Sequence, residues 1–359
     1  MSDQTRLATP RAVNGPEEPR GGEPRQISGS ERPALWRRLL SSPAGRAALA
    51  LLLVLAVGAI FNADGAFFNP GTHRDTLREA SVTGILACGM TLVIISGGID
   101  LSVGSVLALV AVCAATMAIH WNWPAWLVVP CCLCVGAAAG GAAGLVTARF
   151  GVQPFIATLA MMVLARGLAK YASGGMKVST AIQNSDGTFH YVPVPPLFHG
   201  IGARILDGNL AVVTLIFLVC VATAWLALSR HRWGRYLYAI GGNEEAARLS
   251  GIPVVSAKTF AYVASGVFAA VAGLCEAAQE QQGDPEAGNG YELTAIAMVV
   301  IGGTNLMGGR GGMGLTLLGV LTIGYLDKIL SINAVPDAGR LVLTGIIIVA
   351  AVLTQRRKN

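Results

Sequence analysis

The residues of this chain that could do chemistry are concentrated in one polar run, Arg230–Lys258, the longest charged interruption of its hydrophobic part. Five residues of the run are Lys or Arg, and an apolar segment of membrane length lies on each side. A loop with that much positive charge between two membrane spans is typical of the cytoplasmic side. The chemistry that such a loop can do is electrostatic and steric contact with a soluble partner.

The middle of the run predicts a short helix. Asn243 can cap it, Glu244 and Glu245 favour its first turn, and Gly251 can end it, with Pro253 just beyond. A helix of about two turns is not stable alone in water, so it must pack on its neighbours. Two interpretations stay open from the residues alone: a helix exposed for docking, or a solvated loop that only joins two spans.

Signatures of catalysis are missing from the sequence. A nucleotide-binding phosphate loop needs a Gly-Lys-Ser or Gly-Lys-Thr step, which the chain lacks, and its Gly-rich run 308–312 has no strand before it. No Ser-His-Asp or His-Glu-x-x-His arrangement suited to hydrolysis can be assembled, because the five histidines fall in predicted loops. We therefore predict that the chain is not an enzyme and binds no cofactor.

The seven cysteines all fall inside apolar runs. Cys131, Cys132 and Cys134 are close together, but no second Cys or His cluster follows at the spacing of a zinc site. We expect small, reduced, buried side chains and no metal site.

The elements that must position the polar run are predicted to be membrane helices. The chain has 359 residues, of which 53% are hydrophobic and only 13% are charged, whereas a soluble domain carries about a quarter charged residues. Apolar runs of about 20 residues predict an all-α polytopic membrane protein with about ten transmembrane helices. The net charge of +6 is spread over tails and loops, so we expect no nucleic-acid partner.

Ten spans are predicted, at roughly 44–61, 75–96, 101–119, 124–147, 154–173, 209–229, 256–277, 291–310, 312–331 and 338–355. They form a transmembrane domain over 44–355, between a Pro-rich, disordered tail at 1–43 and a short tail at 356–359. An even count puts both tails on one side, and their basic residues indicate the cytoplasm. His73, Arg74 and Arg78 are exceptions that the count puts outside, so either the second span begins later or they lie on an interfacial helix.

Charged residues inside the predicted spans are few. Most lie near an outer end, where long side chains can reach the interface; the set is Glu79, Arg166, Lys170, Glu276, Asp327 and Lys328. No proton relay or paired ion-coupling cluster can be built from them. This scarcity argues against a proton- or sodium-driven carrier.

Two polar segments are predicted to face outward. Residues 174–208 hold several prolines and glycines and are too polar to span, so they are expected to cover the surface. The second, around Gly283–Glu286, is acidic. Both segments could meet a protein that delivers a substrate, or could be plain connectors.

Two glycine-rich pieces of the chain are alike. Gly97–Gly104 and Gly302–Gly309 align without gaps, with four of eight positions identical and Asp100 opposite Asn305. Asp or Asn there can accept hydrogen bonds from backbone N–H groups freed by a tight turn. The likeness is explained either by a parallel repeat of a transporter architecture or by chance similarity of tight turns.

Four stretches together resemble the permeases of ribose-type (monosaccharide) ABC transporters. Gly234–Asn243, with Glu245–Ala247 and Gly251, is similar to the ATPase-coupling loop of that family. The other stretches are Gly97–Ser105, Gln153–Leu159 with Arg166–Gly167, and Tyr291–Ile296 running into Gly302–Thr304 and Gly308–Gly311. The resemblance covers about residues 45–355 and is more specific for the family than for the substrate.

The resemblance implies an ABC importer permease fold in a bacterial plasma (inner) membrane. It also implies a second permease copy, a separate cytoplasmic ABC ATPase that binds the ATP, an extracytoplasmic solute-binding protein, and a small sugar as substrate. For coupling to the ATPase we predict Gly234, Arg235, Asn243, Glu245, Ala246, Ala247 and Gly251. For the translocation path or its gate we predict Asp100, Ser102, Gln153, Phe155 and Asn305. Because the lumen is predicted to be mostly apolar, selectivity is expected mainly in the binding protein.

Two alternatives remain at this point. The same machinery could carry another small polar solute, such as a branched-chain amino acid, a nucleoside or a signalling furanose. A secondary carrier or channel would need no ATPase, and it would purify in active form without one.

Overall fold

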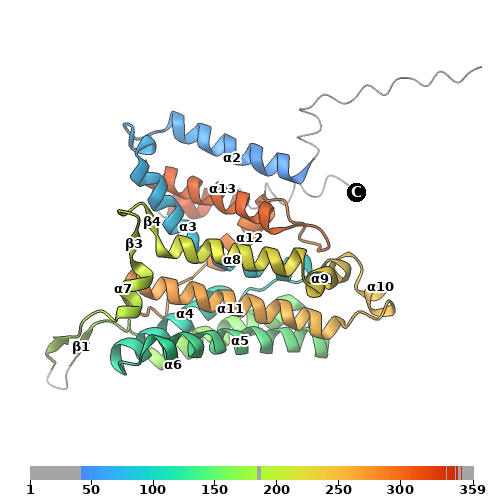
Figure 1. Cartoon of the computed structure of the whole chain (residues 1–359), viewed down its shortest axis with the longest axis horizontal. Coiled ribbons are helices and arrows are strands. Elements are labelled where there is room, and N and C mark those ends of the chain that lie inside the picture. The colour runs from blue at the N-terminus through green and yellow to red at the C-terminus, as the bar shows by residue number, and fades with distance from the viewer. Residues whose placement is uncertain (1–41, 184–186, 337, 344, 347–348, 350–359) are drawn as a thin grey trace, which may run out of the picture.

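The computed structural model describes residues 42–183, 187–336, 338–343, 345–346 and 349, and these are mostly helical (Figure 1). Eight helices in this part of the chain are long and apolar enough to cross a membrane. The strands are short and form two separate two-stranded sheets. The prediction of an all-α polytopic membrane protein is confirmed.

The helices follow one another with short connections. The long ones are α2 (Pro43–Ile60), α3 (Pro70–Ile95), α4 (Val103–Ala115) continued by η2 (Thr116–His120), α5 (Ala125–Phe150), α6 (Pro154–Ser173), α8 (Val212–Ser229), α11 (Val254–Glu280) and α13 (Met313–Ile332). The short ones are η1 (Ala66–Phe68), α7 (Pro196–Gly202), α9 (Arg232–Gly242), α10 (Glu244–Leu249) and α12 (Tyr291–Ile301). Helices α9 and α10 lie at one end of the bundle, here called the α10 end, and α7 lies at the opposite, α7 end (Figure 1).

Helix α11 is at the centre of the bundle and packs on α3, α4 and α5. Its contact with α5 is a close approach of two backbones. A Cβ atom on Gly140 would lie 2.1 Å from the Tyr262 carbonyl oxygen, and one on Gly266 would lie 2.0 Å from the Gly136 carbonyl oxygen. Small residues permit this packing, which stabilises helix pairs where both helices are already in lipid.

The predicted ninth span, 291–310, is helical only over α12. This helix has 11 residues and is about 16 Å long, too short to cross a bilayer. It ends because the glycines after it adopt backbone angles foreign to a helix, with φ of 105° at Gly303 and 87° at Gly308. The predicted tenth span, 338–355, lies partly outside the described residues, and the described positions between 338 and 349 are helical.

Helix α4 begins inside the bundle and not at its surface, where the predicted span 101–119 would start. Non-helical residues 96–102 follow α3 and run along α11, where Ser265 donates a 2.7 Å hydrogen bond to Asp100. Ser265 lies three turns, about 16 Å, from the start of α11. One turn into α4, the carbonyl of Leu107 contacts Gly273, about 28 Å along α11. The first turn of α4 therefore lies well inside the membrane-spanning part of α11.

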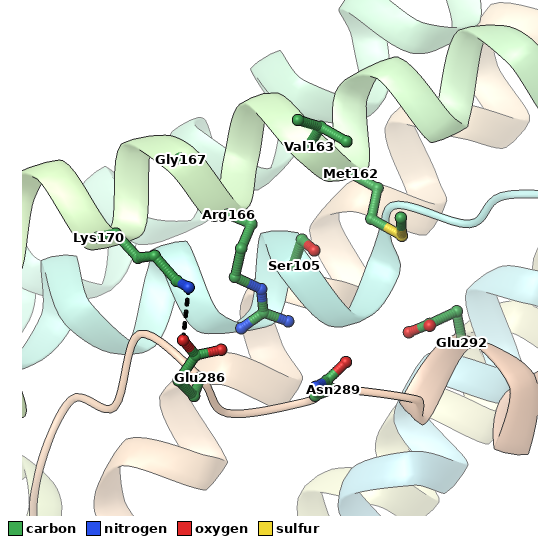
Figure 2. Close-up of a pocket in the computed structure, with 9 residues that line it drawn as sticks. All are labelled: Ser105, Met162, Val163, Arg166, Gly167, Lys170, Glu286, Asn289 and Glu292. Carbon is green, nitrogen blue, oxygen red and sulfur yellow. Dashed lines mark ion pairs between the residues drawn. The ribbon is translucent and has the colours of Figure 1, made fainter. Parts of the chain in front are cut away.

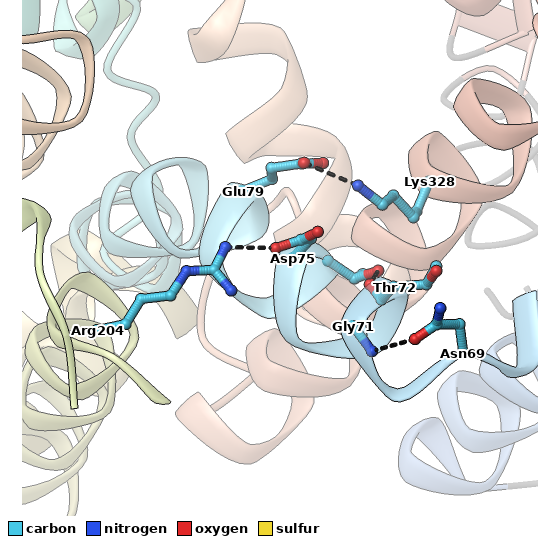
Figure 3. A network of polar contacts seen from close by, with 8 residues as sticks. Asn69, Gly71, Thr72, Asp75, Glu79, Arg204 and Lys328 are labelled. Atoms are coloured by element: carbon cyan, nitrogen blue, oxygen red, sulfur yellow. Dashed lines mark hydrogen bonds and ion pairs between the residues drawn. The ribbon is translucent and has the colours of Figure 1, made fainter. Parts of the chain in front are cut away.

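Polar pairs join the helices at the α7 end (Figure 3). Arg204 pairs with Asp75 of α3 at 2.5 Å, and Lys328 of α13 pairs with Glu79 of α3 at 2.8 Å. Helix α3 starts at Pro70, capped by Asn69, so the basic residues 73, 74 and 78 lie in the first turns of this span. The helix therefore begins before the predicted span 75–96 and not later in the chain, and the place of these basic residues relative to the membrane interface stays a prediction.

The segment predicted to cover the surface does so at the α7 end. Strands β1 (Ala181–Gln183) and β2 (Phe189–Tyr191) pair, as do β3 (Arg204–Ile205) and β4 (Leu210–Ala211). Between them α7 buries Phe198, which is 1% exposed, and packs on α11. Lys177 pairs with Asp284 at 3.0 Å, so the acidic loop 281–290 is bound to this cover. Although burial raises the pKa of Asp284, the Glu286 N–H and Lys177 lower it below its ordinary value.

Candidate functional site

Helix α9 is packed tightly against the spans at the α10 end. Leu237 is completely buried, and Trp233 stacks on Phe260 of α11 with ring centroids 5.6 Å apart and planes 20° apart. A Cβ on Gly234 would lie 2.3 Å from the Leu228 carbonyl oxygen of α8. Gly234, predicted for coupling, is therefore the residue that lets α9 lie directly against α8.

The predicted short helix is confirmed as α10. Its first turn is capped by Asn243, whose side-chain oxygen accepts a 2.9 Å hydrogen bond from the Ala246 N–H. Glu244 and Glu245 occupy the first turn, where the helix dipole favours negative charge. Gly251, with a φ of 80°, reverses the chain just after the helix, a conformation that glycine adopts at little cost.

Helix α10 is anchored to the spans by one apolar and one charged contact. Ala247 is 5% exposed, and Lys258 at the start of α11 pairs with Glu244 at 2.5 Å. Arg248 pairs with the same carboxylate at 3.0 Å. Burial raises the pKa of Glu244, but Lys258 and Arg248 outweigh it and hold the pKa below its ordinary value.

The outer face of α10 is exposed to solvent. Glu245 and Ala246 are exposed, and Leu249 is 84% exposed. Arg235 is exposed on the neighbouring α9. A rigid helix that presents one leucine, one carboxylate and a nearby cation to solvent can dock on a protein surface.

Lys258→Met should loosen α10 without unfolding the bundle. A partly exposed ion pair contributes about 0.5–1 kcal/mol, so opening of α10 should become roughly two- to fivefold more frequent. Because the pKa of Glu244 is lowered in the folded state, the stabilisation by the ion pair is present above the ordinary glutamate pKa and is lost as the pH falls through the lowered value.

The measurement is the rate of trypsin cleavage after Arg248 in inside-out vesicles. Lys177→Met removes an equivalent pair at the α7 end and should leave this rate unchanged; equal rates in both variants would contradict the anchor.

The last turn of α9 touches both glycine-rich segments through its backbone. A Cβ on Gly241 would lie 1.9 Å from the Ile95 carbonyl oxygen and 2.4 Å from the Gly309 nitrogen, and the Gly309 N–H donates a 3.0 Å hydrogen bond to that same Ile95 oxygen. Tyr238 adds a 2.9 Å hydrogen bond to the Gly311 carbonyl. We call the contact of Gly241 with Ile95 and Gly309 the glycine junction. It joins α9 to the end of α3 and to the turn between α12 and α13.

The two glycine-rich segments use the same local hydrogen bond. The Ser102 N–H donates to the Asp100 side chain at 3.0 Å, and the Met307 N–H donates to the Asn305 side chain at 3.2 Å. The predicted role of Asp and Asn at these places, as acceptors for freed backbone N–H groups, is confirmed. The segments differ in place, because Asn305 lies in the turn at the α10 end whereas Asp100 lies inside the bundle.

Asp100 and Ser102 form a buried polar cluster with α11. Both residues are 1% exposed, the Ser102 hydroxyl donates to Asp100 at 2.6 Å, and Ser265 donates to its second oxygen at 2.7 Å. A buried carboxylate is stabilised by such donors. These hydrogen bonds hold residues 96–102 against α11. The role of Asp100 and Ser102 in the translocation path stays a prediction.

The other residues predicted for the path lie at the start of α6. Gln153 is exposed and Phe155 is 54% exposed. Among the described residues, the hydrogen bonds of Asp100 come from Ser102 and Ser265. Thr158, one turn after Gln153 and Phe155, donates a 3.3 Å hydrogen bond to the Ile99 carbonyl. The five predicted path residues are therefore spread over three places.

Several residues of this site were not identified from the sequence. Gly241, Tyr238 and Lys258 act through contacts between segments far apart in the chain, which no local pattern reveals. Leu249 could have been found, because an apolar residue on the expected exposed side of a short helix is a docking signal. All seven cysteines are free, and the described residues contain no group of three or more His, Cys, Asp or Glu that could hold a metal ion.

The chain is similar to known transport permeases over most of its length. Residues 74–352 match the family model described as "Branched-chain amino acid transport system / permease component". The ribose import permease protein of Haemophilus influenzae is 40% identical over 309 residues, covering 86% of this chain and 91% of the relative. The fructose import permease protein of Rhizobium meliloti is 33% identical over 88% of this chain and 85% of the relative. The L-arabinose transport system permease protein of Escherichia coli is 34% identical over 78% of this chain and 80% of the relative. No solved structure matches the chain.

Proposed function

This chain belongs to the branched-chain amino acid transport system / permease component family, and on that premise we propose that it is the permease subunit of an ATP-driven ABC importer for a monosaccharide. The observation that carries the proposal is an anchored, solvent-exposed α10 in a chain that is 40% identical to a ribose import permease. The family description names branched-chain amino acids, but the relatives reported above are named for ribose, fructose and arabinose. These names favour a sugar over the other small solutes.

The orientation follows from charge. The polar run Arg230–Lys258, with α9 and α10, lies on the cytoplasmic side, because basic loops are retained there. The α7 end then faces outward, in the inner membrane of a bacterium. The predicted tails lie almost wholly outside the described residues, and we propose that both are cytoplasmic.

The mechanism starts at α10. A cytoplasmic ATPase docks on Glu245, Ala246 and Leu249 and moves α10 and α9 as one body when it closes on ATP. The glycine junction transmits this movement to the ends of α3 and α12, and the spans tilt. The ATPase must dock differently in its two nucleotide states, since equal docking would shift no equilibrium.

The translocation path requires a second copy of this chain. The outer face of α6 carries exposed apolar residues at mid-span, among them Val163 and Leu164, which suit a contact with another permease or with lipid. A solute-binding protein delivers the sugar at the α7 end. Asp100, Ser102, Gln153, Phe155 and Asn305 remain our candidates for gating residues along this route.

The proposal is tested in proteoliposomes that contain the permease, the ABC ATPase encoded beside it, and the matching binding protein. Uptake of D-ribose, D-fructose or L-arabinose should require ATP and all three components. Uptake of a sugar by the permease alone would instead identify a secondary carrier. ATP-driven uptake of leucine with no uptake of any sugar would assign the branched-chain amino acid alternative.

A further inference from the structure

A cavity of about 410 Å³ lies where α6, the start of α4 and the loop 281–290 come together (Figure 2). We call it the Arg166 cavity. Its lining residues are Ser105, Met162, Val163, Arg166, Gly167, Lys170, Glu286, Asn289 and Glu292. In Figure 2 Arg166 points from α6 across the cavity toward the loop, and Lys170 reaches down to Glu286. The volume is that of a site for a small molecule.

The cavity extends from near the middle of the membrane toward the α7 end, because Lys170 is only about 5 Å from the end of α6. Arg166 is about 18 Å from the start of α6 and about 10 Å from its end, by the rise of a helix. Glu292 is the second residue of α12 (Tyr291–Ile301), about 14 Å from the far end of that helix. Because both helices have one end at the α10 end, these lengths agree on a depth near the middle of a hydrocarbon core of about 30 Å.

Two interrupted spans begin at this cavity. A Cβ on Gly104, in the first turn of α4, would lie 2.2 Å from the Gly288 carbonyl oxygen and 2.7 Å from a carboxylate oxygen of Glu292. The starts of α4 and α12 therefore meet, one helix running toward each side of the membrane. Broken helices that meet at the midplane build the substrate sites of many transporters.

The charges of the cavity cannot face lipid. The side chains of Lys170 and Glu286 pair at 2.6 Å but stay 48% and 58% exposed, and Asn289 is exposed. A charged group that faces the hydrocarbon core is costly, and such groups usually face a protein interior or a water-filled cavity. The opening must therefore meet water, which in the proposed importer is supplied by the translocation path.

We infer that the Arg166 cavity is a solute-binding subsite of the translocation path, and that it takes a neutral polyhydroxylated solute such as a pentose or hexose. This inference rests on the proposed function. The lining holds two cations, Arg166 and Lys170, and two carboxylates, Glu286 and Glu292, so it carries no net charge to select an ion. Sugar hydroxyls both donate and accept hydrogen bonds, which suits this mixture of groups.

Arg166 shapes the site as well as lining it. Its Nη1 donates to the carbonyl oxygens of Pro285 and Ala287 at 2.6 Å and 2.8 Å, which holds the loop across the cavity. A guanidinium has five N–H donors in all, so others are left for a solute. Met162 and Val163 offer an apolar wall to the C–H face of a sugar ring. The polar side chains of the Arg166 cavity are thus close together. The sequence had predicted a translocation path that is mostly apolar.

The first test fills the cavity without removing a polar group. Met162→Trp should lower ATP-driven uptake of D-ribose, D-fructose or L-arabinose, whichever the wild type carries, by about tenfold or more, with the assembled complex still purified intact. Leu52→Trp, on the exposed face of α2 and outside the lining, should stay close to wild type. Normal uptake by Met162→Trp would overturn the subsite while leaving the importer in place, whereas a wild type that carries none of the three sugars would overturn both.

The second test detects binding directly. Asn289→Cys places a thiol at the exposed rim, and its alkylation by N-ethylmaleimide in the assembled transporter is followed at residue 289 by mass spectrometry. The transported sugar should slow the alkylation in a saturable way, and ribose 5-phosphate, which is charged, should not. Equal rates with and without sugar, or protection by the phosphate alone, would overturn the inference.

Discussion

Glu245→Arg should lower ATP-driven uptake by roughly tenfold or more while the protein stays folded and inserted. Glu245 is exposed in the first turn of α10, so its replacement removes no contact within the bundle. The new cation opposes the helix dipole slightly and reverses the charge offered to the ATPase, and like charges brought together at an interface cost several kcal/mol. Uptake in proteoliposomes and the amount of ATPase that copurifies are the two measurements.

Asp64→Arg is the matched control for this prediction. Asp64 is exposed in the turn after α2, at the α7 end, so the charge reversal is the same but lies across the membrane. Uptake and copurification should both stay near wild type in the control. Unchanged uptake in Glu245→Arg would contradict the assignment of α10 as the docking helix, and reduced membrane insertion would show that the residue acts in folding.

Gly241→Val should uncouple the transporter more severely than any other single change at the glycine junction. Its Cβ would lie 1.9 Å from the Ile95 carbonyl oxygen, so the two backbones must separate by more than about 1 Å to reach normal contact. That separation breaks or distorts the hydrogen bond from Gly309 to Ile95 and detaches α9 from both glycine-rich segments. Overpacking of this kind costs about 1–3 kcal/mol. We expect ATP hydrolysis to continue while sugar uptake falls about tenfold or more.

Gly242→Val provides the matched control, because a Cβ on Gly242 meets nothing within 4 Å. Both substitutions add the same β-branched side chain to the last turn of α9, so any effect of helix propensity is shared. Uptake should fall in Gly241→Val alone. Equal loss in both variants would mean that the last turn of α9 matters for its helicity and not for the junction.

The two predictions describe one mechanical route. Helix α10 is held to α11 by Glu244 and Lys258, and α9 is held to the bundle by Trp233 and Gly234. We therefore expect movement imposed on α10 to reach the ends of α3 and α12. From there the Asp100 segment and α12 lead to the Arg166 cavity, where both interrupted spans begin.

The sequence alone determined the fold class, the family and the short helix α10, whose coupling role stays a proposal. Scarce charge and long apolar runs exclude a soluble domain, because backbone groups in lipid must be satisfied within helices. The cap at Asn243, the acidic first turn and Gly251 act over a few neighbouring residues, so their pattern predicted α10 correctly. The family motifs were recognisable for the same reason, since each is a continuous stretch of chain.

The tertiary structure alone decided where the interrupted helices begin and which polar groups meet. Residues 96–102 follow α3 and run along α11, where Ser265 donates a hydrogen bond to Asp100. Helix α12 starts near the middle of the membrane, where Arg166 binds the loop that precedes it. Hydropathy could not predict where α4 and α12 begin. An apolar stretch has the same hydropathy whether the helix starts at the membrane surface or inside the protein. Contacts such as Gly241 with Ile95 join residues far apart in the chain, and their energy comes from packing distances that exist only in the folded bundle.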